Sequence, residues 1–332
     1  MPTYQVSLLG NNHRFLNPGL QSILHAGLAS GYNLKYGCEG GNCGECLAWL
    51  QSGKLKTIRH SDYQFSTEEK QQKAFLMCCK APDSDIEIEA IEHGVAEDIP
   101  QQAITAKVYS KSLLTESALM LTLRTPRSQS LKFLAGQYVT LKLDNGLSRN
   151  KSIASCPCDG LNPVFHVHLN ANNAFDKYVF EQLKKNEKIQ ILGPQGNFIL
   201  NDDSIRPILL IAFNTGFASI NGLLDHLIAL EKAQDIELYW MMSPGHEEYL
   251  ANYCHSIDDA FDNLYYNPIC LPDTSTESLD LVISQIIQSH PNLSEFDIFA
   301  ALPTFYHQRA TELFTSANVA VESLKLDYLE KL

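Results

Sequence analysis

The chain has 332 residues, a length that predicts two or three domains, each large enough for a hydrophobic core of its own. With 45% apolar and 19% charged residues and a net charge of −13, it reads as a globular protein that does not bind nucleic acid. No apolar run approaches the roughly 20 residues of a membrane span and no signal peptide is visible, so we expect no membrane insertion and a cytoplasmic location.

The first 93 residues alternate as a small α+β domain should. Short strands are expected at residues 4–9, 14–16 and 47–50, with a helix over 23–29 that Ser22 caps. Residues 86–89 alternate between apolar and acidic side chains, which predicts an edge strand. The polar stretch 94–102 then reads as a linker.

Three cysteines within the first domain carry the strongest signal in the chain. Cys38, Cys43 and Cys46 have the spacing C-x4-C-x2-C, which is typical of a plant-type [2Fe–2S] cluster with a fourth, remote ligand. The intervening glycines allow backbone N–H groups to turn toward sulfur atoms. A zinc site is less consistent with this pattern, because zinc sites usually have two short C-x2-C pairs and only one is present.

The fourth ligand has two candidates, because Cys78 and Cys79 are adjacent and their side chains point in different directions. The other cysteines are scattered, which fits a reducing compartment. We expect Cys156 and Cys158 to be unconnected loop thiols, since their spacing is not C-x-x-C.

Residues 103–200 show short strands separated by turn residues, which predicts a small antiparallel β-barrel interrupted by a helix over 174–183. Residues 201–332 alternate buried strands with helices, which predicts an open α/β sheet. Charge differs between these segments. Residues 101–200 carry 12 basic and 6 acidic residues, whereas residues 201–332 carry 5 basic and 20 acidic ones.

Several short motifs resemble the ferredoxin-NADP⁺ reductase superfamily, in its oxygenase-reductase and CDP-6-deoxy-3,4-glucoseen reductase type. They are residues 135–138 (Ala-Gly-Gln-Tyr), 149–155, 193–196 (Gly-Pro-Gln-Gly) and 215–218. The resemblance spans essentially the whole chain. It implies an N-terminal β-grasp [2Fe–2S] ferredoxin domain (1–93), a linker (94–102), an FAD-binding-like β-barrel (103–200) and an NAD(P)-binding-like α/β domain (201–332).

In such proteins hydride passes from NAD(P)H to FAD, and single electrons then pass to the cluster and on to an oxygenase or a deoxysugar dehydratase. The resemblance also favours Cys78 over Cys79 as the fourth ligand. The implied ligand set is therefore Cys38, Cys43, Cys46 and Cys78, with Arg149, Lys151 and Ser152 as flavin-contacting positions.

The chain departs from the family at the flavin motif. Lys151 replaces the aromatic residue that packs on the flavin, and Asp176 replaces a serine that approaches the FAD pyrophosphate. A carboxylate at ~4 Å from a phosphate costs about 1 kcal/mol in water and about 4 kcal/mol at an effective dielectric constant near 20. The sequence therefore predicts weak FAD binding or none.

The nicotinamide motifs depart further. Phe213 and Asn214 stand at the family's paired-glycine turn, Met241 replaces a later glycine, and Ala301-Leu302 replaces a Cys-Gly pair. Leu324 stands where the family has an aromatic that covers the flavin. Together with the acidic last third, these losses lead us to expect no NAD(P) binding.

Two functions remain open at this point, and no catalytic residue is assigned. The first is an electron-transfer protein that delivers electrons from its cluster to an oxygenase or dehydratase type of partner, served by a separate reductase because its own flavin and nicotinamide modules are impaired. The alternative is an active flavin-dependent NAD(P)H reductase component. A regulatory iron–sulfur sensor has only Cys79, beside the cluster, in its favour.

Overall fold

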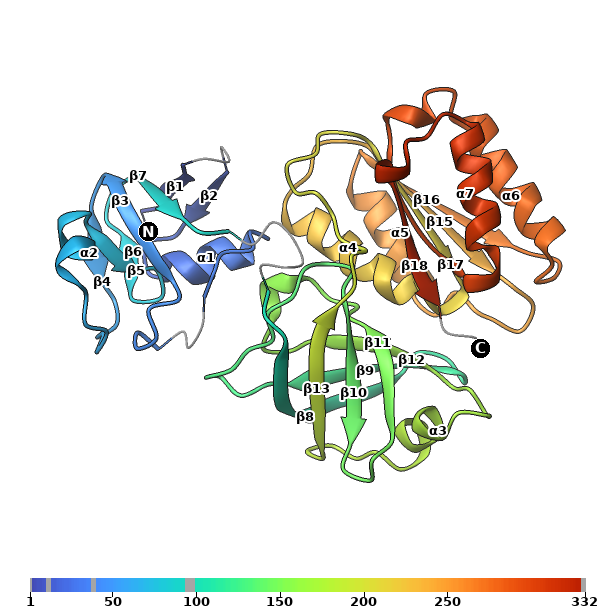
Figure 1. Ribbon diagram of the computed structural model, residues 1–332, viewed down its shortest axis with the longest axis horizontal. Helices are drawn as coiled ribbons and strands as arrows, with labels where there is room; N and C mark the ends of the chain where they lie inside the picture. Colours follow the sequence, from blue (N-terminus) through green and yellow to red (C-terminus); the bar gives the residue numbers. More distant parts are fainter. Residues whose placement is uncertain (1, 10–12, 37–39, 93–98, 330–332) are drawn as a thin grey trace.

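The computed structural model describes residues 2–9, 13–36, 40–92 and 99–329, and these residues form three large sheets and one small two-stranded sheet (Figure 1). Residues 93–98, in the predicted linker, lie outside the described residues, as does Cys38. None of the described helices is long and apolar enough to cross a membrane. We refer below to the N-terminal unit (residues 2–92), the barrel (99–200) and the C-terminal unit (201–329).

The N-terminal unit is built on a mixed five-stranded sheet with the order β2-β1-β7-β3-β5. Its elements are β1 (Tyr4–Leu8), β2 (Arg14–Asn17), α1 (Ile23–Ala29), β3 (Leu47–Ser52), α2 (Thr67–Gln71), β5 (Ala74–Leu76) and β7 (Ile86–Ala90), with a separate hairpin-like pair of β4 (Leu55–Thr57) and β6 (Lys80–Pro82). Ser22 caps α1 as predicted, because its side chain accepts a hydrogen bond from the backbone N–H of His25.

The prediction that residues 86–89 form an edge strand is wrong. β7 pairs in parallel with β1 and antiparallel with β3, so it lies inside the sheet. The alternation of buried Ile86 and Ile88 with exposed glutamates reports only which face of the strand meets the core. Alternation is the same for an edge strand and a central one, and only the pairing of distant segments distinguishes them.

The barrel is a nearly closed sheet of six antiparallel strands in the order β11-β10-β13-β8-β9-β12. Apolar side chains from alternate positions fill its interior, with Phe165 and Phe175 fully buried among them. The elements are β8 (Gln102–Leu113), β9 (Ala118–Arg124), β10 (Tyr138–Leu143), β11 (Ser148–Ser152), η2 (Pro157–Asp159), β12 (Val164–His168), α3 (Ala174–Glu181) and β13 (Lys188–Gln195).

The C-terminal unit is a five-stranded, all-parallel sheet in the order β16-β15-β14-β17-β18. Helices cover both faces, with α4 and α5 in one core cluster and α6 and α7 in the other (Figure 1). The main elements are β14 (Ile208–Phe213), α4 (Phe217–Ala229), β15 (Ile236–Met242), α5 (Ala251–Ala260), β16 (Leu264–Cys270), α6 (Thr276–Ser289), β17 (Asp297–Pro303), α7 (His307–Ser316) and β18 (Leu324–Leu329).

The strand order places a topological switch point in the C-terminal sheet. The chain runs outward from β14 through β15 to β16, and then returns to the other side of β14 with β17 and β18. Loops after β14 and β17 therefore leave in opposite directions and open a crevice at the carboxyl ends of these strands, where open α/β sheets bind their ligands.

Candidate redox and cofactor sites

The described part of the cysteine loop packs tightly against residues 60–63. Gly41 has φ +87°, and a Cβ at this position would come within 2.7 Å of the Cys79 Sγ. Gly44 has φ +81°, and a Cβ there would meet the ring of Tyr63 at 2.4 Å. Any larger residue at either position would be strained and would push the loop away from the cysteines.

Two of the predicted ligands come together beneath this loop. The Cys46 and Cys78 thiols are buried and hydrogen-bond to each other, and the backbone N–H of Gly41 donates to the Cys78 sulfur. Cys79 Sγ lies 3.6 Å from Cys78 Sγ but donates to the carbonyl of His60 at 3.7 Å. Cys78 therefore contacts Cys46 and the Gly41 amide, whereas Cys79, which also lies close to Gly41, donates to the His60 carbonyl.

Cys43 is exposed at the edge of the loop, and Cys38 lies outside the described residues. Within the described residues no three His, Cys, Asp or Glu side chains converge as a metal site. The donor set nevertheless fits an iron–sulfur cluster, because the thiols lie under the glycine-containing loop and the Gly41 N–H donates to the Cys78 sulfur.

A second candidate site is a cavity of about 1100 Å³ between the barrel and the C-terminal unit. On the barrel side its wall comes from β10, β11 and β12. On the other side its wall comes from the residues that follow β14 and β17, at the switch point of the parallel sheet. The cavity therefore joins the outer surface of the barrel to the crevice in which a dinucleotide would be expected.

The three predicted flavin-contacting residues, Arg149, Lys151 and Ser152, all line this cavity on β11. Both cations pair with Asp176, which lies in the first turn of α3 and is only 1% exposed. The Lys151 Nζ is 3.1 Å from Oδ1 and the Arg149 guanidinium contacts Oδ2. The group keeps one net positive charge, so it fits an anionic ligand although the Asp176 carboxylate competes for the same two cations.

Two neutral histidines of β12 line the same cavity. Burial lowers the pKa of His166 to about 3. Burial, with the nearby His246 and Lys151, lowers the pKa of His168 to about 4. The Nε2 atoms of both rings are buried and have no hydrogen-bond partner among the residues that the structure describes. An orphaned polar atom in a cavity wall fits a bound group with hydrogen-bonding edges, such as a flavin.

The turn after β14 shows how the chain replaces the family's paired glycines. Asn214 has φ +49°, a left-handed conformation that Asn tolerates better than most residues. Its side chain holds the turn, donating to Ser243 Oγ at 2.9 Å and accepting from the Ser243 backbone N–H at 2.9 Å. Phe213 lines the cavity but is only 3% exposed and belongs to the same core cluster as Met241, so it is part of the cavity wall and leaves the crevice open.

The far rim of the cavity holds Leu324 and an aromatic residue that the sequence analysis missed. Leu324, at the start of β18, lines the cavity at the position expected for a flavin cover. Phe305 follows β17, lines the cavity and is 61% exposed. An exposed aromatic directly after a strand that carries the switch point is the signal that could have identified it.

Cys156 and Cys158 form a disulfide, so the prediction that they are unconnected loop thiols is wrong. The backbone explains the pairing. η2 begins at Pro157 and turns the chain so that the two Cα atoms are 5.2 Å apart, within the usual range for a disulfide.

Comparison with known proteins agrees with this arrangement. Residues 6–83 match the 2Fe-2S iron-sulfur cluster binding domain, and residues 105–199 match the oxidoreductase FAD-binding domain. The CDP-6-deoxy-L-threo-D-glycero-4-hexulose-3-dehydrase reductase of Yersinia pestis is 32% identical over 289 residues, which is 86% of each chain. Reductase component 1 of terephthalate 1,2-dioxygenase from Comamonas sp is 34% identical, over 67% of this chain and 65% of that one.

Solved structures show the same fold. The ferredoxin reductase of a carbazole 1,9a-dioxygenase superposes with a TM-score of 0.58 at 21% identity, over 99% of both chains. An Amycolatopsis cytochrome P450 reductase gives a TM-score of 0.59 at 21% identity, over 98% of both. From the domain matches and the Yersinia relative, the chain belongs to the ferredoxin-NADP⁺ reductase superfamily, in the group of oxygenase-type reductases with an N-terminal [2Fe–2S] ferredoxin domain.

Proposed function

We propose that the protein is a flavin-dependent NAD(P)H reductase component that delivers single electrons through its [2Fe–2S] domain to a partner enzyme. FAD, when bound, converts the two-electron hydride of NAD(P)H into the single electrons that a cluster accepts. The observation that carries the proposal is the cavity of about 1100 Å³, which connects barrel strands β10–β12 to the switch point between β14 and β17. This placement is what hydride transfer from a dinucleotide to a flavin requires.

This proposal replaces the main prediction from the sequence, an electron carrier with an impaired reductase module that does not bind NAD(P). The relatives are named as reductases, and the impairment is not evident in the crevice. Asn214 supplies the positive φ of a missing glycine, and Phe213 packs in the core. The substitutions in the nicotinamide motifs therefore change the side chains that line the crevice, and the crevice itself stays open.

Roles for the cavity residues follow from their chemistry. Arg149 and Lys151 would hold the pyrophosphate of FAD, and the neutral His166 and His168 would each present the Nε2 atom to the bound group as a donor or an acceptor. Phe305 would cover the open side. Cys38, Cys43, Cys46 and Cys78 would bind the cluster.

The partner is proposed to be a dehydratase or an oxygenase, as the names of the relatives say of those proteins. The pairing of both phosphate-binding cations with Asp176 favours a second candidate, in which FAD is held too weakly to work and a separate reductase supplies the electrons.

An absorption spectrum after incubation with FAD and exhaustive dialysis distinguishes the two candidates. The reductase proposal predicts flavin bands at about one FAD per chain beside the cluster bands. A spectrum with cluster bands alone, at every FAD concentration tested, would leave only the electron carrier.

A further inference from the structure

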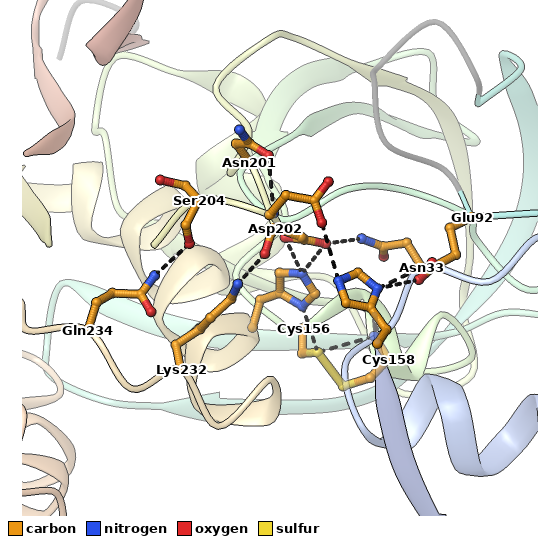
Figure 2. A network of polar contacts seen from close by, with 12 residues as sticks. Asn33, Glu92, Cys156, Cys158, Asn201, Asp202, Ser204, Lys232 and Gln234 are labelled. Carbon is orange, nitrogen blue, oxygen red and sulfur yellow. Dashed lines mark hydrogen bonds and ion pairs between the residues drawn. A yellow bond between two sulfur atoms is a disulfide. The ribbon is translucent and has the colours of Figure 1, made fainter. Parts of the chain in front are cut away.

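The disulfide between Cys156 and Cys158 lies outside the cavity just described, at the meeting point of all three units of the protein (Figure 2). It belongs to the barrel loop between β11 and β12. Cys156 is 7% exposed, whereas Cys158 is partly accessible. One bonded sulfur is therefore enclosed by protein, and the other can be reached by a small reagent.

Behind the enclosed sulfur lies a histidine that is itself fixed by a carboxylate. The Nδ1 of the buried His226, on α4, is 3.7 Å from Cys156 Sγ. Its Nε2 is 3.2 and 3.3 Å from the two carboxylate oxygens of Asp202. Because a carboxylate only accepts hydrogen bonds, Nε2 carries a proton, and in the neutral form of the ring the Nδ1 lone pair faces the sulfur.

This arrangement favours the reduced form of the pair. In the disulfide, Cys156 has no S–H, so His226 Nδ1 receives no hydrogen bond from it. After reduction the Cys156 thiol can donate to Nδ1 in the dry contact. A cross-link that spans a single residue also restricts the unfolded chain far less than one that closes a long loop, so it contributes little as a structural staple.

The array formed by the disulfide, His226 and Asp202 contacts the N-terminal unit at two points. The Asp202 carboxylate accepts a hydrogen bond from Asn33 Nδ2 at 3.1 Å, a contact visible in Figure 2. The loop that carries the disulfide contacts α1 through η2, and a Cβ on Gly160 would come within 3.1 Å of the Tyr36 hydroxyl. Asn33 and Tyr36 precede the cysteine loop in the sequence, so these contacts connect the disulfide to the segment that leads into that loop.

We propose that Cys156 and Cys158 are a redox-active pair whose oxidation state sets how firmly the N-terminal unit docks on the barrel and the C-terminal unit. In a reducing compartment, which the sequence predicts, disulfides are typically transient and redox-sensing. The existence of the redox pair is independent of the proposed reductase function. Its effect on electron passage from flavin to cluster rests on that function.

The exchange balances with a cellular dithiol as reductant. One thiolate of the dithiol attacks the accessible Cys158 sulfur, the Cys156–Cys158 bond breaks, and a mixed disulfide forms while Cys156 takes up the proton. The second thiol of the reagent then closes its own disulfide and releases Cys158 as a thiol. Two electrons and two protons pass from the dithiol to the pair, and no other reactant is needed.

Thiol trapping on the full-length protein tests the pair itself. The protein is equilibrated in buffers of reduced and oxidised dithiothreitol, quenched in acid, alkylated under denaturing conditions, and the peptide that contains both cysteines is measured by mass spectrometry. We expect a cooperative change from no alkylation to double alkylation while the protein remains folded. Double alkylation of protein never exposed to reductant, or protection until the protein unfolds, would overturn the proposal.

His226→Leu tests whether His226 contributes to the redox equilibrium of the disulfide. The leucine side chain cannot accept a hydrogen bond from the Cys156 thiol, so the reduced form loses one hydrogen bond and the midpoint should move to a ratio of reduced to oxidised dithiothreitol about five- to tenfold higher. Cys270→Ser, at an exposed cysteine outside the disulfide, should leave the midpoint unchanged. An unchanged midpoint in His226→Leu would contradict the role of His226.

Hydrogen–deuterium exchange at residues 32–36 tests the docking. Reduction of the wild-type protein should change protection there, and the double variant Cys156→Ser/Cys158→Ser should show the reduced pattern with or without reductant. If reductant alters the double variant as much as the wild type, the switch lies elsewhere. None of these measurements requires flavin or NAD(P)H, so their failure is distinct from failure of the proposed reductase function.

Discussion

Lys151 Nζ lies 3.1 Å from the Oδ1 of Asp176, a carboxylate that also pairs with Arg149 and is 1% exposed. A buried carboxylate thus occupies the two cations that the flavin motif provides for a phosphate. In the apoprotein this carboxylate offsets one of the two positive charges, and FAD must compete with Asp176 for the same two cations.

Asp176→Asn should therefore strengthen FAD binding, by roughly tenfold or more, because one negative charge leaves the phosphate site. The apoprotein should lose stability, since Arg149 and Lys151 then lack their buried counter-ion. Fluorescence titration gives the dissociation constant, and Asp144→Asn, on the exposed turn after β10, is the matched control. Unchanged or weaker FAD binding in Asp176→Asn would show that the carboxylate does not compete.

The different contacts of Cys78 and Cys79 lead us to expect opposite results when each is replaced by serine. Cys78→Ser should bleach or destabilise the cluster, because Cys78 Sγ contacts Cys46 and accepts from the Gly41 amide. Cys79→Ser should leave the visible spectrum nearly unchanged, because Cys79 is directed to the His60 carbonyl. The reverse pattern would assign the fourth ligand to Cys79 and leave the fold unaffected.

Lys132, from the barrel, should raise the reduction potential of the cluster. Its Nζ lies 5.5 Å from the centre of the Tyr36 ring. Burial lowers the pKa of Lys132, and the nearby charges of Glu45 and Cys43 oppose that shift. A cation stabilises the more negative, reduced cluster.

Lys132→Gln should accordingly lower the potential by roughly tens of millivolts from a starting value near −400 mV, if the cluster is typical of its type. Redox titration followed by electron paramagnetic resonance measures the shift. Lys107→Gln, at an exposed position of β8, should leave the potential unchanged. A higher potential in Lys132→Gln would be inconsistent with this role.

His166 should make the protein less stable in mild acid. Burial lowers its pKa from 6.5 to about 3, so between these values the unfolded chain binds a proton that the folded chain excludes. The free energy of unfolding therefore falls as the pH drops below about 6.5, by roughly 2 kcal/mol at pH 5. His166→Gln should reduce the difference between urea unfolding at pH 7 and at pH 5, whereas His255→Gln, on an exposed face of α5, should not.

The sequence predicts the three-part architecture because patterns between residues close in the sequence are enough to identify each part. Period-2 alternation marks β10, capping marks α1, and the cysteine spacing together with the resemblance indicates the N-terminal domain. The domain limits at residues 93, 102 and 200 and the complete ligand set, with Cys38 outside the described residues, stay predictions.

The sequence predicts less where distant segments decide the outcome. The inner position of β7 depends on pairing with β1 and β3, and the Cys156–Cys158 bond depends on the turn at Pro157. The absence of a glycine from a motif also gives a wrong expectation when another residue adopts the backbone conformation that the glycine would have had. Asn214 does so because Ser243, 29 positions later, holds its side chain, a contact that no local pattern reveals.

The most direct test of the reductase proposal is anaerobic rapid mixing of the FAD-loaded protein with excess NADH or NADPH, followed at the visible bands of the cluster. The proposal predicts bleaching of the cluster within seconds and without any added reductase. NADPH should react more slowly than NADH, because its 2′-phosphate approaches a segment with 5 basic and 20 acidic residues. Bleaching only by dithionite or a separate reductase would contradict the proposal and identify the chain as an electron carrier.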